Sequence, residues 1–271
     1  MAKSETLQPL NSFTLESRSR VQFLLCDIDD TVSTDGVLPA ASYTAIERLD
    51  AAGITVIPIT GRPAGWCDMI ARFWPVGGVV GENGALYFRY DRTAKRMIRH
   101  YWKSDAERAA DRTRLDDLAR DIPIAVPGSA IASDQAYREA DLAIDFCEDV
   151  APLPLSDIDR IVALFTERGA MAKVSSIHVN GWFGDYDKMA MTRILFDQEF
   201  AINLDEAKQH CAFVGDSPND EPMFGFFENS VGVANLLNFR ARLHTPPSYV
   251  TNERAGHGFV ELADSLISAR A

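Results

Sequence analysis

Three carboxylates gather at the end of an apolar segment near the start of the chain. Residues 21–29 read VQFLLCDID, and Asp30 follows directly. Ionised carboxylates held side by side repel one another and raise each other's pKa, so the cluster requires a positive partner. Oxygen ligands select hard cations, and Mg²⁺ typically takes one or two carboxylates with waters and a substrate phosphate. The segment therefore predicts a Mg²⁺ site that includes Asp27 and Asp29.

Polar side chains also follow two later apolar segments, ITVIPIT and CAFVG. They are Thr60 and Gly61 after the first segment, Asp216, Asn219 and Asp220 after the second, and Lys188 in the stretch DYDKMA between them. In an open parallel sheet the carboxyl ends of the strands meet at one edge, and ligands bind there. We expect all of these side chains to converge on that edge.

This set of groups suits phosphoryl transfer. An aspartate whose second oxygen is held on a metal can attack phosphorus and form an aspartyl-phosphate, so Asp27 is the candidate nucleophile. A carboxyl two residues along an extended chain points the same way, and Asp29 could protonate the leaving oxygen and then activate water. Thr60 and Lys188 would hold the phosphoryl oxygens, because positioning and electrostatics supply most of the catalysis in such reactions.

The segments that must position these groups alternate between strand and helix. Residues 21–29 read as a buried strand, Pro39 can open a helix that Gly53 closes, and ITVIPIT reads as a second strand. A helix at 63–73 and a strand in GGVVGENGA complete a βαβαβ pattern, which predicts an α/β fold with a doubly wound, Rossmann-like parallel sheet. The alternation resumes after about residue 185 and ends in a helix near 258–269.

The middle of the chain has a different character. ALYFRY and RMIRHYW read as a hairpin, and Ser104 with Glu107 forms a capping box that opens a helix running to about Arg120. Further on, DLAIDFC reads as a strand, a helix follows that Ser156 and Asp159 can cap, and AMAKVSS and IHVNGWF read as two strands. We expect an inserted α+β unit at 85–184 within a core of 1–84 and 185–271, with junctions at 81–84 and 184–188.

The ordered motifs DIDDTVS, ITGRP, the lysine of DYDKMA and VGDSPNDEPMF resemble those of the haloacid-dehalogenase-like (HAD) hydrolase superfamily. The resemblance covers about 21–84 and 185–271. It implies that Asp27 is the nucleophile and Asp29 the general acid/base, whose main-chain carbonyl also binds Mg²⁺. It further implies phosphate ligands at Thr60, Gly61 and Lys188, a direct metal ligand at Asp216, a direct or water-mediated one at Asp220, and support of the phosphate pocket by Asn219.

One position departs from the usual pattern. Many members have glycine after the acid pair, whereas this chain has Asp30. We expect its side chain to point away from Asp27, in a turn or helix-cap role, with an effect on local flexibility and none on the mechanism.

The insertion after the second motif resembles the cap of the Cof-type or IIB group, of C2B type. That group includes sucrose-phosphate, trehalose-phosphate and mannosyl-3-phosphoglycerate phosphatases and the eukaryotic phosphomannomutases. The resemblance implies a phosphatase for a phosphorylated sugar or small polyol. A phosphomutase with the same nucleophile and a non-catalytic binding protein of the same fold are the alternatives.

The inserted unit must recognise the leaving group, and it offers few polar candidates. His178 and Asn180 would share one face of an extended strand with Trp182. Arg138 is a third candidate, although it could instead pair with Glu139 or Asp141. Asn83, beside the core site at the first junction, is a fourth.

Bulk composition narrows the partners. The chain of 271 residues has a formal charge of −12, which argues against nucleic acid, because phosphate binding needs a basic face. The first 20 residues lack the apolar core of a secretory signal, and no stretch approaches a membrane span. Four cysteines without metal-ligand spacing are expected to be reduced. We expect a cytoplasmic monomer or homodimer whose partner is a small phosphate ester.

Overall fold

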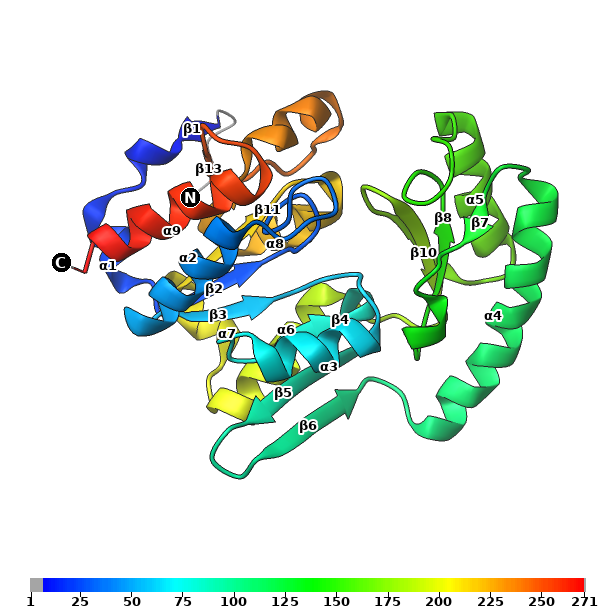
Figure 1. Ribbon diagram of the computed structural model, residues 1–271, viewed down its shortest axis with the longest axis horizontal. Coiled ribbons are helices and arrows are strands. Elements are labelled where there is room, and N and C mark those ends of the chain that lie inside the picture. Colours follow the sequence, from blue (N-terminus) through cyan, green and yellow to red (C-terminus); the bar gives the residue numbers. More distant parts are fainter. Residues whose placement is uncertain (1–6, 271) are drawn as a thin grey trace.

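The computed structural model describes residues 7–270; the ends of the predicted core, 1–6 and 271, lie outside this range. Figure 1 shows two bodies joined by chain segments: a larger α/β body, which contains both ends of the chain, and a smaller α+β body drawn in green. This arrangement confirms the predicted α/β core with an inserted unit.

The core is built on a six-stranded sheet whose neighbouring strands all run parallel, in the order β1-β13-β12-β11-β2-β3. Its strands are β1 (Gln8–Pro9), β2 (Phe23–Cys26), β3 (Thr55–Pro58), β11 (Cys211–Gly215), β12 (Asn229–Gly232) and β13 (Tyr249–Val250). Leu24 of β2 pairs with Ala212 on one side and Val56 on the other. Strands β2 and β11 are buried along their whole length, as expected for a parallel sheet covered on both faces.

Helices cover the two faces of this sheet. The core helices are α1 (Leu15–Arg20), α2 (Ala40–Ala51), α3 (Ala64–Phe73), α6 (Lys188–Phe200), α7 (Leu204–Ala207), α8 (Glu221–Phe226) and α9 (Ala255–Ser268). Leu24 packs in the cluster that contains α2, α3 and α9, whereas its neighbour Leu25 packs in the cluster of α6 and α8. Successive side chains of a strand point to opposite faces, so one strand joins two apolar layers.

Short 3₁₀ segments connect several of these elements. They span Leu10–Ser12, Glu82–Gly84, Gln135–Tyr137, Lys208–His210, Pro218–Asp220 and Ala234–Arg242. Two of the predicted helix boundaries are confirmed: α2 begins directly after Pro39, and Gly53 follows its end in the left-handed conformation with φ of 75°. Helix α6 begins at Lys188, because the carboxylate of Asp187 caps it by accepting the Ala190 N–H at 2.7 Å.

The predicted hairpin packs with the core. Strands β4 (Val79–Gly81), β5 (Leu86–Asp91) and β6 (Arg96–Tyr101) form an antiparallel sheet, and the Thr60 N–H bonds to the Val80 carbonyl, which continues the core sheet beyond β3. Leu86 and Phe88 pack with α2 and α3, whereas Tyr87 packs with α6. We therefore propose that the inserted unit begins after β6 and not at residue 85.

The inserted unit, hereafter the cap, has its own sheet and apolar cluster. Strands β7 (Ala130–Ile131), β8 (Leu142–Asp145), β9 (Met171–Val174) and β10 (His178–Trp182) pair antiparallel in the order β7-β8-β10-β9. Helices α4 (Asp105–Ala125) and α5 (Leu155–Glu167) lie on the side of this sheet turned away from the core (Figure 1). Ile144 and Val179 pack against these helices, so the alternate residues of β8 and β10 face the core.

The ends of the cap helices were predicted with mixed success. The capping box of Ser104 and Glu107 is present at the start of α4, which runs to Ala125, beyond the predicted end at Arg120. The predicted caps of the next helix, Ser156 and Asp159, are wrong. That helix begins at Leu155 after Pro154, whose ring fixes the extended entry into the first turn.

Two general expectations concern the whole described chain. None of the helices within 7–270 is long and apolar enough to cross a membrane. All four cysteines are free thiols, and Cys26, Cys67 and Cys211 are buried among apolar side chains.

Candidate active site

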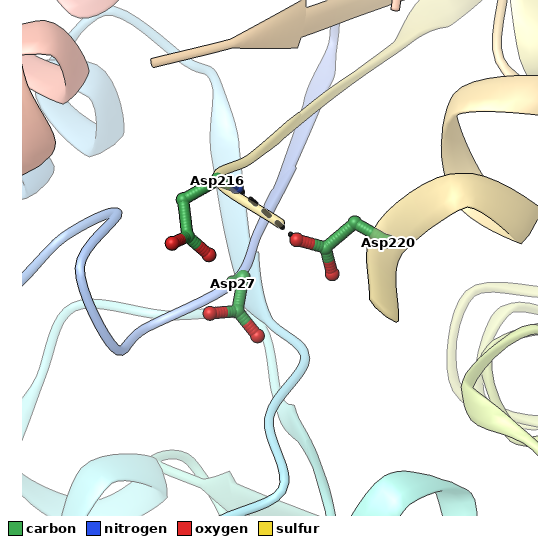
Figure 2. A group of neighbouring side chains, drawn as sticks. All are labelled: Asp27, Asp216 and Asp220. Atoms are coloured by element: carbon green, nitrogen blue, oxygen red, sulfur yellow. Dashed lines mark hydrogen bonds between the residues drawn. The ribbon is translucent and has the colours of Figure 1, made fainter. Parts of the chain in front are cut away.

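Three aspartates from three segments converge at the carboxyl edge of the core sheet. Asp27 follows β2, Asp216 follows β11, and Asp220 ends the short 3₁₀ segment after it. Figure 2 shows their carboxylates turned toward one another, with ligand oxygens that all lie within 4.8 Å. All three residues are buried. The convergence that the strand pattern predicted is therefore confirmed.

The turn after β11 folds Asp220 back toward Asp216. The Asp216 N–H donates to Asp220 Oδ2 at 3.2 Å, the bond drawn in Figure 2. Gly215 permits this approach, because a Cβ there would lie 2.3 Å from the same oxygen. Pro218 begins the 3₁₀ segment, where its fixed φ suits a first helical position.

Burial makes this acidic group electrostatically costly. Burial, together with the charges of Asp220 and Asp29, raises the pKa of Asp27 to about 7, and Lys188 counteracts part of the effect. Burial, followed by the charges of Asp27 and Asp220, holds the pKa of Asp216 well above its ordinary value. The repulsion is therefore only partly relieved by the protein's own groups.

Lys188 is the basic side chain at the centre of the site. Its Nζ lies 2.8 Å from Asp27 Oδ1 and 3.1 Å from Asp220 Oδ1. Burial alone would lower the pKa of Lys188, but Asp220 and Asp27 raise it above its ordinary value. The lysine is thus a fixed cation that touches the candidate nucleophile.

The acidic group fits a divalent hard cation. Carboxylate oxygens are the donors that Mg²⁺ prefers, and a bound cation would relieve the remaining repulsion. The side chain of Asp29 is not part of this group, and a metal contact through its main-chain carbonyl stays a prediction.

The loop after β3 places the predicted phosphate ligands beside Asn83. The Thr60 hydroxyl accepts the Arg62 N–H at 3.0 Å, and the Thr60 carbonyl accepts the N–H of Asn83. A Cβ at Gly61 would lie 3.2 Å from the amide atoms of Asn83. Asn83 adopts a φ of 55°, and within residues 7–270 its Nδ2 has no hydrogen-bond partner. It lines a cavity of about 170 Å³ together with Lys188 and Asn219.

A small cavity of about 20 Å³ lies between the core site and the cap, with room for one or two waters. Its core residues are Asp27, Asp29, Gly61, Arg62, Asp216, Ser217 and Asn219, and its cap residues are Arg138, Ser175, Ser176, Ile177, His178 and Asn180. The structure therefore brings the predicted cap residues Arg138, His178 and Asn180 to the core site. The loop at 175–177 was not predicted to be part of the site. Its only polar side chains are two serine hydroxyls, which give little indication of a functional role.

The contacts of Arg138 favour the structural alternative for this residue. Its guanidinium pairs with Asp141 at 3.0 Å and Asp134 at 3.1 Å, and it donates to the Gly61 carbonyl of the core at 2.9 Å. Asn180 Nδ2 also donates to Asp141, at 3.1 Å. Arg138 thus joins cap to core through the loop that holds the predicted phosphate ligands.

A larger cavity of about 270 Å³ adjoins Asp29. It is lined by Asp29, Asp30, Ser33, Asp35, Gly36, Arg62, Cys147, Glu148, Ser176 and Ile177. Asp30 lies in a turn, as predicted, with a φ of 54°. Aspartate tolerates this left-handed conformation better than most residues, although glycine suits it best.

Three further residues of the site carried no predicted role. Arg62 pairs with Asp29, Glu148 of the cap pairs with Arg62, and Asn235 Nδ2 donates to Asp216 Oδ2 at 3.3 Å. Arg62 belongs to the motif ITGRP and could have been found there. Glu148 and Asn235 lie in a loop and a 3₁₀ segment, where no periodicity indicates which way a side chain points.

No protein-family model and no curated protein matches the chain. Several solved structures match it closely in fold. The C-terminal domain of trehalose-6-phosphate phosphatase from C. albicans has a TM-score of 0.70 and 15% identity, over 99% of each chain. A haloacid dehalogenase-like hydrolase from Bacteroides thetaiotaomicron has a TM-score of 0.62 and 12% identity, over 91% of this chain and 99% of that one.

A third structure is that of a HAD/COF-like hydrolase from Plasmodium vivax. Its TM-score is 0.64 at 16% identity, over 94% of this chain and 99% of that one. Together with the core sheet and the inserted cap, these likenesses define the class: the chain has the fold of the HAD-like hydrolases. Within that fold, the cap follows the second motif, as the resemblance to the Cof-type group implies.

Proposed function

We propose that this protein is a Mg²⁺-dependent phosphatase that hydrolyses a phosphorylated sugar or small polyol through an aspartyl-phosphate on Asp27. The observation that carries the proposal is the meeting of Asp27, Lys188 and the acidic group at one sheet edge, with Asp29 in the same small cavity. A binding protein has no need of a nucleophile, a fixed cation and a second carboxyl together.

Each residue has a defined task in this reaction. An oxygen of Asp27 forms a bond to phosphorus as the ester P–O bond breaks, and Asp29 gives a proton to the departing oxygen. Asp29 then takes a proton from the water that hydrolyses the aspartyl-phosphate, which regenerates Asp27. Lys188 and the loop of Thr60 and Gly61 hold the phosphoryl oxygens. Asp27, Asp216, Asp220 and the Asp29 carbonyl would hold Mg²⁺, which would supply positive charge against the phosphoryl group when bound.

The two cavities that Arg62 lines favour a leaving group with hydroxyls over one with a second phosphate. The arginines that line them, Arg62 and Arg138, are each paired with carboxylates. The larger cavity also presents the carboxyl groups of Asp30 and Asp35, which would repel a second phosphate. Carboxylates accept hydrogen bonds from hydroxyls, so the cavity suits a sugar or polyol. This supports a hydrolase over the alternative of a phosphomutase, whose bisphosphate must bind at two places.

The neighbouring structures support the same reaction class. One of them is named a trehalose-6-phosphate phosphatase, and its fold spans nearly all of this chain. At this low identity the likeness carries the fold alone, so the choice of substrate rests on the cavity.

The test is release of inorganic phosphate from a panel of sugar, polyol and nucleotide phosphates, with and without Mg²⁺. We expect turnover that requires Mg²⁺ and favours sugar or polyol monophosphates. Asp27→Asn should abolish it, because an amide is a poor nucleophile. Asp50→Asn is the control, since it makes the same change at an exposed acid near the end of α2.

Three outcomes would overturn the proposal. If the Asp27→Asn variant kept most of the activity, Asp27 would not be the nucleophile. Phosphate exchange between sugar positions, dependent on a bisphosphate and with little net release, would favour the mutase. Mg²⁺ binding without turnover on the whole panel would favour a non-catalytic protein.

A further inference from the structure

Arg62 holds the candidate general acid/base by both of its oxygens. The Nε of Arg62 lies 3.0 Å from Oδ1 and 3.1 Å from Oδ2 of Asp29, and its Nη2 lies 2.8 Å from Oδ1. The Arg62 side chain is 5% exposed, and its guanidinium lies 4.5 Å from the ring of Trp66. A planar guanidinium fork sets the orientation of a carboxylate as well as its distance, so Arg62 determines where Asp29 points.

The other side of the same guanidinium is held by the cap. Glu148 Oε1 lies 2.9 Å from the Nη2 that also contacts Asp29, and Asp134 Oδ2 lies 3.5 Å from Nη1. Core and cap thus share one arginine between their carboxylates. The cap carboxylates also balance the charge of the buried Arg62 guanidinium.

Glu148 is itself held in place by its surroundings. Asp145, at the end of β8, accepts the N–H groups of Cys147 and Glu148 at 2.9 and 2.8 Å, and its other oxygen accepts the Asp149 N–H at 2.8 Å. On β10, His178 Nε2 lies 2.9 Å from Glu148 Oε2. The loop that carries Glu148 therefore has a fixed shape, and its carboxylate points at Arg62.

We propose that Glu148 of the cap is a positioning residue for Asp29, acting through Arg62. Without Glu148, the guanidinium loses its partner on the cap side, and the carboxyl of Asp29 is no longer held at one orientation. The proton donor is then complete only while the cap lies over the core, which couples cap placement to catalysis. This inference rests on the proposed phosphatase activity and gives Glu148, which also lines the larger cavity, a role in orienting Asp29.

The consequence is selective for the leaving group. An alkoxide leaving from a glycerol or sugar phosphate needs a proton as the P–O bond breaks, whereas p-nitrophenolate is stable enough to leave without one. Misplacing Asp29 should therefore slow alkyl phosphates far more than p-nitrophenyl phosphate. A general loss of structure would slow both substrates alike.

The experiment compares wild type and Glu148→Ala by the rate of leaving-group release in the first turnover, at saturating glycerol phosphate or p-nitrophenyl phosphate. This rate excludes hydrolysis of the aspartyl-phosphate, in which Asp29 acts for both substrates. We expect a loss of about 10- to 100-fold on glycerol phosphate, a fraction of the full effect of a general acid, and a loss of less than about threefold on the aryl ester. Glu148→Gln keeps an acceptor oxygen for Arg62 and should recover part of the lost rate. Glu167→Ala is the control, because it removes a cap glutamate paired with Arg160 on the surface.

A double-mutant cycle tests the route through Arg62. Arg62→Lys replaces the fork with a single ammonium and should show the same selectivity. Adding Glu148→Ala to it should cost little more, because the two residues act in series. The inference would be overturned if Glu148→Ala slowed both esters equally or neither of them, or if the losses of the two variants were fully additive. In each of these cases an active wild type would leave the proposed function standing. An inactive wild type would overturn both.

Discussion

Lys188 Nζ lies 2.8 Å from Asp27 Oδ1, although 161 positions separate the two residues in the chain. The whole cap lies between them in the sequence, so the chain must leave the core, build the cap and return before this pair can form. Where the chain re-enters the core, Asp187 is the N-terminal capping residue of α6, and Lys188 is therefore the first residue of that helix. The contact between Lys188 and Asp27, which the proposed catalysis requires, therefore depends on correct placement of the cap.

Removal of Lys188 should impair phosphoryl transfer. Lys188→Ala leaves Asp27 and Asp220 without the cation that offsets their charge, and it removes a contact to the phosphoryl oxygens. We expect kcat to fall by about 10²- to 10³-fold, the usual effect of losing one group that stabilises transition-state charge. Steady-state kinetics on the best substrate measures it, with Arg120→Ala, which removes a cation paired with Asp117 on the surface of α4, as the control. A loss of less than tenfold would contradict the role.

Mg²⁺ should stabilise the fold through the acidic group. A ligand that binds only the folded state raises the melting temperature, so wild type should melt higher as MgCl₂ is added. Asp216→Asn removes a ligand and should lose most of this shift. Without Mg²⁺ the variant should melt at the wild-type temperature or above, because it has one fewer repelling charge. Thermal melts with EDTA and with MgCl₂ measure both effects, and an unchanged shift in the variant would contradict the site.

The ion pair of Glu148 should make stability depend on acid pH. The contact with His178, and then Arg62, lowers the pKa of Glu148 to about 2, against the opposing effect of burial. A carboxyl whose pKa is lowered on folding contributes stability above its ordinary pKa near 4.5 and loses it as the pH falls toward 2. Urea unfolding at pH 6 and pH 3 should therefore show Glu148→Gln to be less stable than wild type at pH 6, with a smaller difference at pH 3. A difference that is constant across this range would contradict the pairing.

The buried carboxylate of Glu82 should be important for attachment of the cap. Its oxygens accept four N–H groups, from Ala64 of the core at 2.8 Å and from cap residues Glu139, Ala140 and Asp141 at 2.9, 2.7 and 3.1 Å. Glu82→Ala leaves these donors buried without an acceptor. We expect unfolding to become easier by about 3 kcal/mol, since an unsatisfied buried group costs about 1–3 kcal/mol.

Urea unfolding measures this effect, and Glu139→Gln is its control, because that glutamate side chain is 45% exposed beside Arg108. The Glu82 variant should also show faster hydrogen exchange at residues 139–141 than wild type. Unchanged stability and exchange would mean that other contacts hold the cap in place.

Much of the fold could be predicted because buried strands appear in the sequence as runs of apolar residues. The apolar runs of β2, β3 and β11 are long enough to identify strands covered on both faces, and their order predicts a parallel sheet. The convergence of Asp27, Asp216 and Asp220 followed from that sheet, since each lies at or just beyond a strand's carboxyl end.

The hairpin of β5 and β6 shows where this reasoning stops. Alternating side chains identify a half-buried strand, but they do not say which body covers its buried face. The hairpin that was predicted to open the cap has Tyr87 and Phe88 packed on opposite sides with the core, which is why we propose a later start for the cap.

Side chains that pair across the junction between cap and core were the least predictable. Arg138 was a candidate for substrate recognition, with pairing to Glu139 or Asp141 as the alternative, and it holds Asp134, Asp141 and the Gly61 carbonyl. Glu148 had no predicted role, yet it meets Arg62 across the site. The types and order of the residues were sufficient to indicate the catalytic edge, because strand ends place it locally. The partners of Arg62, Arg138 and Glu82 depend on how the core and the cap meet. That contact follows from packing in three dimensions, and the spacing of residues along the chain does not indicate it.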